Sequence, residues 1–182
     1  MKQCTVRRMH PILLFVLFLH LVTFSPITVL HLVYVMVCVR CLKHNCLQKI
    51  AYGFGAKVKN KESNCFPCNF NISKPQVIGI KGISDAYQVA VGSVEPNANS
   101  SLHEMIQTAT TIARASKENQ YLVLLVFTNG ESICDLTASA KLLLDSVDAP
   151  LSILFLSPTV EPSEKLQMLV NRVCSKDKSE LY

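Results

Sequence analysis

The residues best placed for chemistry follow an apolar stretch in the second half of the chain. Residues 121–127 (YLVLLVF) are apolar at every position and end at Thr128-Asn129-Gly130. A stretch without alternation is typical of a strand that is buried on both faces of a parallel sheet. Open α/β sheets place their ligand sites at the carboxyl ends of such strands. The end of this strand is therefore where we expect any site to lie, although for Asn129-Gly130 themselves we prefer a simple strand-exit turn.

Common catalytic patterns are missing from the sequence. It contains no G-x-S-x-G, no H-E-x-x-H and no P-loop. Glu131 and Asp135 lie near the exit of the predicted strand, where charged residues are usually solvated turn positions. His103 lies in the first turn of a predicted helix, where a surface role is the simplest interpretation. No nucleophile can be paired with a base, so we expect a protein that is not an enzyme and has no catalytic residue.

Helices and strands alternate on both sides of the apolar stretch. The apolar spacing predicts helices over 78–94, from 102 to about 117, over 136–147 and from 163 onward. Strands are predicted over 52–56, 65–72, 121–127 and 151–156. This alternation predicts an α/β fold with a mostly parallel sheet and helices on both faces.

The charge is distributed unevenly. Residues 1–50 carry six basic and no acidic side chains, whereas residues 51–182 carry 12 basic and 13 acidic ones. The net charge of +5 therefore comes from the first segment. Since the remainder is nearly neutral, we expect no nucleic-acid partner.

The first segment has the composition of a membrane-related leader. Residues 11–39 contain no charged side chain, and about 20 apolar residues are enough to cross a bilayer as a helix. We expect an apolar N-terminal helix in the leader 1–47, with 11–39 as a membrane anchor. A cleaved signal peptide and a leader without any membrane role are the two alternatives.

Several motifs together resemble the copine family. Residues 52–56 (YGFGA) resemble the copine F-G-F-G-A, and residues 79–87 (GIKGISDAY) are similar to its G-I-x-G-I-x-D-A-Y. Residues 121–130 resemble the copine strand that ends in T-D-G, and residues 151–154 resemble its M-S-I-I. The resemblance covers about residues 48–170. It implies a partial von Willebrand factor A-type, Rossmann-like domain over 48–174, followed by a polar tail over 175–182.

In that fold a divalent cation is held by D-x-S-x-S after the first strand, by a Thr and by an Asp. The resemblance places Ser100 at the Thr position and Asn129 at the Asp position, so each keeps an oxygen but neither has a charge. The strand with D-x-S-x-S has no counterpart, and residues 29–39 are a candidate to fill its place. We therefore expect no cofactor, although the family would imply weak binding of Mg²⁺ or Ca²⁺ at these two residues.

The resemblance also implies a function. We expect a non-enzymatic, protein-binding module at a membrane, with the plasma membrane expected and the cytoplasm as the alternative. Copines are calcium-dependent phospholipid-binding proteins, but their two C2 domains do not fit within residues 1–50. The alternative is a degenerate or truncated product that has no independent activity or competes with full-length relatives. The sequence identifies neither the partner nor the topology of the first segment.

Overall fold

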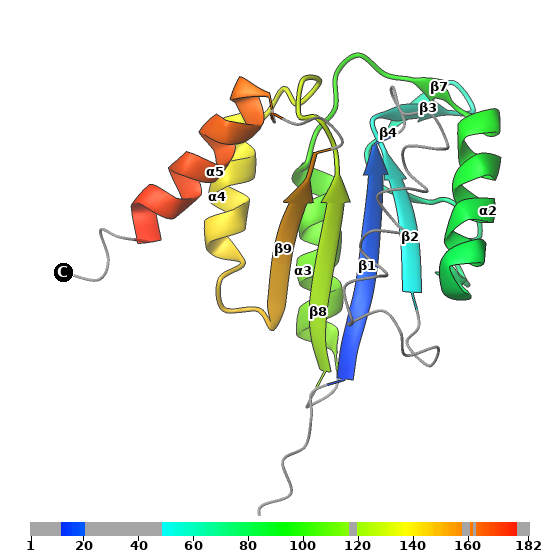
Figure 1. Ribbon diagram of the computed structural model, residues 1–182, viewed down its shortest axis with the longest axis horizontal. Coiled ribbons are helices and arrows are strands. Elements are labelled where there is room, and N and C mark those ends of the chain that lie inside the picture. Colours follow the sequence, from blue (N-terminus) through cyan, green and yellow to red (C-terminus); the bar gives the residue numbers. More distant parts are fainter. Residues whose placement is uncertain (1–11, 21–48, 117–119, 158–160, 162, 178–182) are drawn as a thin grey trace, which may run out of the picture.

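The computed structural model describes residues 12–20, 49–116, 120–157, 161 and 163–177. A six-stranded sheet forms its centre (Figure 1). Four neighbouring strands run parallel in the order β2-β1-β8-β9. Their bounds are Lys49–Phe54 (β2), Ile12–His20 (β1), Gln120–Phe127 (β8) and Leu151–Leu156 (β9). This arrangement confirms the predicted α/β class and the predominantly parallel sheet.

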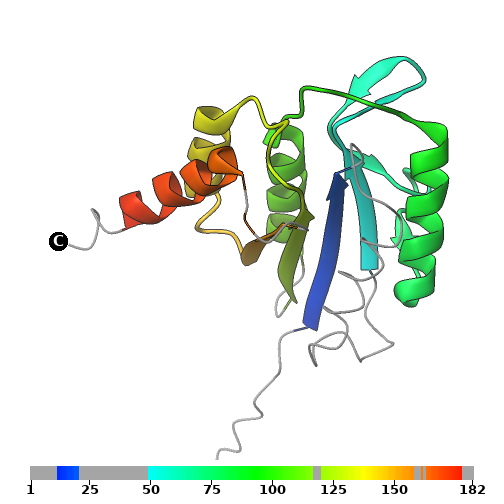
Figure 2. The same ribbon diagram turned by 45° about the horizontal axis from the view of Figure 1, so that its top comes forward.

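Short strands complete the sheets. β5 (Phe66–Pro67) and β6 (Gln76–Val77) both pair antiparallel with β2 at one edge of the main sheet. A small second sheet has the order β4-β3-β7, with bounds Lys61–Ser63, Ala56–Val58 and Glu95–Pro96. Its hairpin of β3 and β4, cyan in Figure 2, projects beyond the end of β2.

Among the described residues, four helices cover the main sheet. They are α2 (Gly79–Ser93), α3 (His103–Ala115), α4 (Leu136–Asp145) and α5 (Glu164–Asp177). Apolar side chains of α3, α4 and α5 share one buried cluster with one face of the sheet, whereas those of α2 share another with the opposite face. Figure 1 shows α2 at the β2 side of the sheet and α4 with α5 at the β9 side.

Strand β8 is buried on both faces, as its continuous apolar sequence predicted. Leu122, Leu124 and Val126 belong to the cluster with α3, α4 and α5. Leu125 and Phe127 belong to the cluster with α2. Successive side chains of a strand point to opposite faces, so each face of β8 packs against a different helix layer.

The expected N-terminal helix is wrong over residues 12–20, the part of it that the structure describes. Ile12–His20 form strand β1, which lies between β2 and β8 and pairs with both. These residues therefore form the central strand for which the sequence showed no counterpart. Residues 29–39 were the candidate for this position. Branched and aromatic residues are frequent in this stretch, and they favour a strand as readily as an apolar helix. The rest of the 11–39 segment lies outside the described residues.

The structure bears on three further expectations, namely the start of the domain, the membrane span and the strand over 65–72. The main sheet includes Ile12–His20, which precede the predicted domain of 48–174. Within the ranges described, no helix combines the length and apolar character that crossing a bilayer requires. The predicted strand over 65–72 is reduced to Phe66–Pro67, because the chain turns at Phe70, which has φ +53° and whose N–H donates to the carbonyl of Pro67 at 2.8 Å.

Candidate functional site

The turn after β8 closes on itself. The N–H of Gly130 donates to Thr128 Oγ1 at 3.0 Å, and the N–H of Glu131 donates to Asn129 Oδ1 at 3.3 Å. Gly130 has φ +83°, a backbone conformation that L side chains rarely adopt. Both side-chain oxygens thus stabilise a strand-exit turn, which is the interpretation of Asn129-Gly130 that the sequence favoured.

Helix α5 covers this turn. The N–H of Ser163 donates to the carbonyl of Asn129 at 3.2 Å, and Lys165 Nζ donates to the carbonyl of Glu131 at 2.7 Å. A Cβ at Gly130 would lie 2.7 Å from both Leu166 Cβ and Ser163 Oγ. Because glycine alone allows this approach, Gly130 fixes where α5 begins relative to the end of β8.

Ser100 lies in the neighbouring loop and is fully buried. Its Oγ lies 2.9 Å from Ser132 Oγ, and its N–H donates to the carbonyl of Ser132 at 2.9 Å. Its own carbonyl accepts from the N–H of Cys134 at 3.1 Å. Ser100 therefore joins the loop before α3 to the loop after β8, while Asn129 belongs to the turn that α5 covers.

Asp135 has a role in this region that the sequence did not predict. One carboxylate oxygen accepts from Ser101 Oγ at 2.5 Å and the other from the N–H of Leu102 at 3.4 Å. The N–H of Ser101 in turn donates to Asn64 Oδ1 at 3.1 Å. The sequence favours a solvated turn position for Asp135, but its carboxylate holds the start of α3. Its position before α4 gave no signal of this role, because Asp135 makes no side-chain cap bond to α4.

The oxygen atoms of Ser100, Asn129 and Asp135 form a poor ligand set for a divalent cation. The oxygens of Ser100 and Asn129 are neutral and already hydrogen-bonded, and both carboxylate oxygens of Asp135 accept bonds from α3. Hard dications need carboxylates that offset their charge. No group of three or more His, Cys, Asp or Glu suitable for a metal occurs in the described part of the chain. Binding at Ser100 and Asn129 thus stays a prediction from the family resemblance, without a carboxylate to support it.

Cys65 and Cys68 form a C-x-x-C motif, but their thiols are not poised as nucleophiles. Burial raises the pKa of Cys68 to about 12, so this thiol is neutral near pH 7. Burial also raises the pKa of Cys65, whose Sγ lies 3.4 Å from Thr108 Oγ1 as a hydrogen-bond donor. A reactive cysteine needs the opposite shift, so both side chains act as small core residues.

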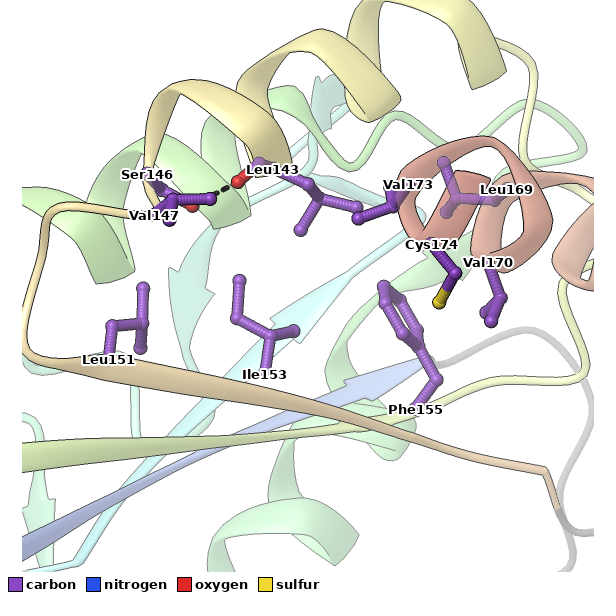
Figure 3. Close-up of a pocket in the computed structure, with 10 residues that line it drawn as sticks. All are labelled: Leu143, Ser146, Val147, Leu151, Ile153, Phe155, Leu169, Val170, Val173 and Cys174. Carbon is purple, nitrogen blue, oxygen red and sulfur yellow. Dashed lines mark hydrogen bonds between the residues drawn. The ribbon is translucent and has the colours of Figure 1, made fainter. Parts of the chain in front are cut away.

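An apolar groove of about 340 Å³ lies between α4, α5 and β9 (Figure 3). Three alternate residues of β9 form its floor, namely Leu151, Ile153 and Phe155. Its walls come from α4 with the turn that follows and from α5, and comprise Leu143, Ser146, Val147, Leu169, Val170, Val173 and Cys174. No lining side chain carries a formal charge, so the groove suits an apolar ligand group.

Strand β9 also has an open edge. It pairs with β8 on one side, and on the other side it pairs with no strand among the residues described. The N–H of Leu122 donates to the carbonyl of Pro150, and that of Thr128 donates to the carbonyl of Leu156. Since parallel ladders repeat every two residues, the backbone groups of Ile153 and Phe155 point to the open edge. The residues that line the groove thus also offer hydrogen bonds beside it.

The fold and these surfaces define an α/β domain with a parallel sheet, and the comparisons identify its family. The family model described as Copine matches residues 19–181. Copine-C of Dictyostelium discoideum is 29% identical over 65% of this chain and 22% of its own length. Protein BONZAI 1 of Arabidopsis thaliana is 32% identical over 70% of the chain and 24% of its own length. Copine family protein 5 of Caenorhabditis elegans is 36% identical over 70% of the chain and 18% of its own length.

The chain belongs to the copine family. It spans about a fifth to a quarter of the length of these relatives. The resemblance drawn from the sequence motifs is thereby confirmed.

Proposed function

We propose that this chain is a protein-binding module of the copine family that acts without catalysis. Its partner contributes an extended segment, which lies along the open edge of β9 and places apolar side chains in the groove between α4 and α5. The observation that carries the proposal is the coincidence of two features on β9. Ile153 and Phe155 line the groove and also direct their backbone groups to the open edge.

The two edges of the sheet support this choice. The edge at β5 and β6 is made of two-residue strands, one of which contains Pro67, and such features block further pairing. β9 has six residues without a charge or a proline, and its Leu154 is 46% exposed. An uncharged edge strand of this length pairs readily with another chain, as in recognition by strand addition. One relative, nicotinic receptor-associated protein 1, is named for its association with a receptor, which agrees with a protein partner.

The proposal includes a fold type. Four parallel strands in the order β2-β1-β8-β9, with helices on both faces, support a variant of the von Willebrand factor A type. The residues after β1 read Leu21-Val22-Thr23-Phe24-Ser25, so the acid of D-x-S-x-S is missing there. We therefore propose recognition that does not depend on a bridging cation.

Peripheral association with a membrane is the second part of the proposal and rests on the family alone. Washing a membrane fraction with alkaline carbonate tests it. A peripheral protein is released into the wash. Retention in the pellet would instead favour an anchor in the part of 11–39 that lies outside β1, and would contradict peripheral attachment.

A photocrosslinking amino acid in cells tests the protein-binding proposal. Val147 on the groove is 69% exposed, and Val89 on α2 is 53% exposed and provides the control position. We expect a discrete adduct with a protein from position 147 and none from position 89. A Leu154→Lys change at the edge of β9 should reduce the adduct while the melting temperature stays within a few degrees. Equal adducts from both positions would contradict the proposal.

A further inference from the structure

A second surface lies at the opposite side of the molecule, next to the small sheet. A pocket of about 320 Å³ opens between the β3–β4 hairpin, the segment from β5 to β6 and the end of α2. Its lining comprises Val58, Lys59, Phe66, Pro67, Phe70, Ile72 and Ser93. The function proposed above does not use this surface, and the groove beside β9 shares no lining residue with it.

Apolar side chains project around this pocket. Ile72 is 85% exposed, which is unusual for an isoleucine. Phe70 is partly exposed and stacks on Phe66 with ring centroids 5.9 Å apart. Its φ of +53° is uncommon for a bulky residue and costs free energy. The fold thus keeps an aromatic ring at the rim of a concave apolar site at a cost to its stability.

The loop that carries these residues is held in place. Asn69 Nδ2 donates to the carbonyl of Lys74 at 2.9 Å, and the N–H of Lys74 donates to Asn71 Oδ1 at 3.0 Å. The N–H of Asn71 donates to Asn69 Oδ1 at 3.0 Å. A loop fixed in this way loses little conformational entropy when a ligand binds.

Positive charge gathers on the same face. The register of the hairpin opposes Val58 to Lys61 and Lys57 to Glu62, and β7 adds Glu95 beside Lys57. Directly opposed residues share a face of a sheet. Both glutamates therefore lie on the face of Lys57, whereas Lys61 shares the face of Val58, which lines the pocket.

Two more lysines lie on the segments that form the pocket, and together with Lys61 we call them its basic rim. Lys59 lines the pocket itself, and Lys74 lies in the same loop as Ile72 and is exposed. The pocket lining contains no carboxylate. The electrostatic complement of this rim is a negatively charged ligand.

We propose that this pocket binds an acidic peptide segment that presents one apolar anchor residue between carboxylates. The anchor enters the concavity between Phe66, Phe70 and Ile72, while the flanking carboxylates meet Lys59, Lys61 and Lys74. A concave site favours a single inserted side chain over a flat bilayer surface. Because the pocket needs both an anchor and charge, it discriminates against peptides that offer only one of them.

A titration followed by amide NMR signals of the full chain tests this. The probe is a capped pentapeptide, Asp-Asp-Phe-Asp-Asp, and two control peptides replace Phe by Gly or all Asp by Lys. We expect saturable shifts at residues lining the pocket with the probe, and binding at least about tenfold weaker with either control. Equal binding of the Gly peptide would mean that charge alone acts, and would overturn the proposal.

Matched variants show whether the pentapeptide binds at this pocket. Ile72→Ser should weaken binding of the probe about tenfold, whereas Ile78→Ser, at a position 90% exposed and outside the pocket, should not change it. The double change Lys61→Glu with Lys74→Glu should abolish it, and Lys141→Glu on α4 should leave it intact. Unaltered binding in the Ile72→Ser variant would contradict the proposal.

Lipid vesicles test the alternative occupant of this surface, which is a membrane. If phosphatidylserine vesicles bind the chain and the pentapeptide does not, the surface serves a membrane and the peptide proposal fails. The crosslink from position 147 lies on the other surface, so the two proposals can fail independently.

Discussion

Asp135 and Ser101, which are 34 residues apart, are joined by a hydrogen bond of 2.5 Å between carboxylate and hydroxyl. The same carboxylate accepts from the N–H of Leu102, next to the first residue of α3. One side chain at the start of α4 therefore fixes the start of α3. The loops at the carboxyl end of the sheet are held by such side-chain bonds.

The first prediction concerns this bond. Asp135→Ala removes the acceptor for Ser101 and Leu102, and hydrogen bonds to charged groups contribute about 1.5–3 kcal/mol when little exposed. Since Asp135 is only partly buried, we expect the free energy of unfolding to fall by about 1–2 kcal/mol in urea denaturation. Glu131→Gln, at an exposed position in the same loop, is the control and should change it by less than about 0.5 kcal/mol. An Asp135→Ala variant as stable as that control would refute the assigned role.

The second prediction concerns β1. Removing residues 1–20 deletes the strand between β2 and β8, which leaves both with an unpaired edge in the middle of the sheet. We expect this shortened chain to lose cooperative unfolding and to aggregate, as judged by circular dichroism and light scattering. Removing only residues 1–11 leaves β1 and should preserve a cooperative transition. If both shortened chains unfolded alike, the central placement of Ile12–His20 would be wrong.

The sequence predicted the strands and helices that local pattern determines. β9 matches its predicted bounds, and β8 extends one residue beyond them, because continuous apolar stretches mark inner strands. Helix α2 begins one residue after its prediction, since its apolar spacing is regular. β1 was missed because a charge-free stretch of such length satisfies a membrane helix and a central strand equally, and only pairing with β2 and β8 decides between them.

The candidate site was only partly predictable. Asn129 could be placed at the exit of β8 from the sequence. The bond between Asp135 and Ser101 could not, because it joins loops that the chain brings together only by folding. The groove at β9 also escaped prediction, since it depends on how far α4 and α5 lie from Ile153.

The third prediction concerns metal. Ser100 and Asn129 supply neutral oxygens that are engaged in hydrogen bonds, so millimolar Mg²⁺ or Ca²⁺ should leave the melting temperature unchanged. An ion that binds only the native state must raise it. A rise that Asn129→Ala abolishes would contradict this expectation and favour a cation site.

The fourth prediction concerns alkaline pH. Burial raises the pKa of Cys68 from 9.0 to about 12, so the thiol ionises in the unfolded chain at a lower pH than in the native protein. Its stabilising contribution is therefore complete below pH 9 and is lost as the pH rises toward 12. We expect the free energy of unfolding to fall in this window by at most about 1.4 kcal/mol per pH unit for this group.

A Cys68→Val variant isolates the contribution of the Cys68 thiol to the pH dependence of stability. It keeps a small apolar side chain in the core but has no group to ionise, so its stability should decline less between pH 9 and 12. Tyr87, whose pKa burial raises to about 12 with a further contribution from Cys68, titrates in the same window and remains in the variant. Identical pH profiles for both proteins would show that the thiol does not contribute.

Amide hydrogen exchange at single residues of β9 tests recognition at this edge most directly. In the free chain we expect the amides of Ile153 and Phe155 to exchange much faster than those of Ser152 and Leu154, which face β8. In complex with the protein captured through position 147, the amides of Ile153 and Phe155 should slow by tenfold or more while the others stay unchanged. Slow exchange at Ile153 and Phe155 already in the free chain, or no slowing in the complex, would contradict the account.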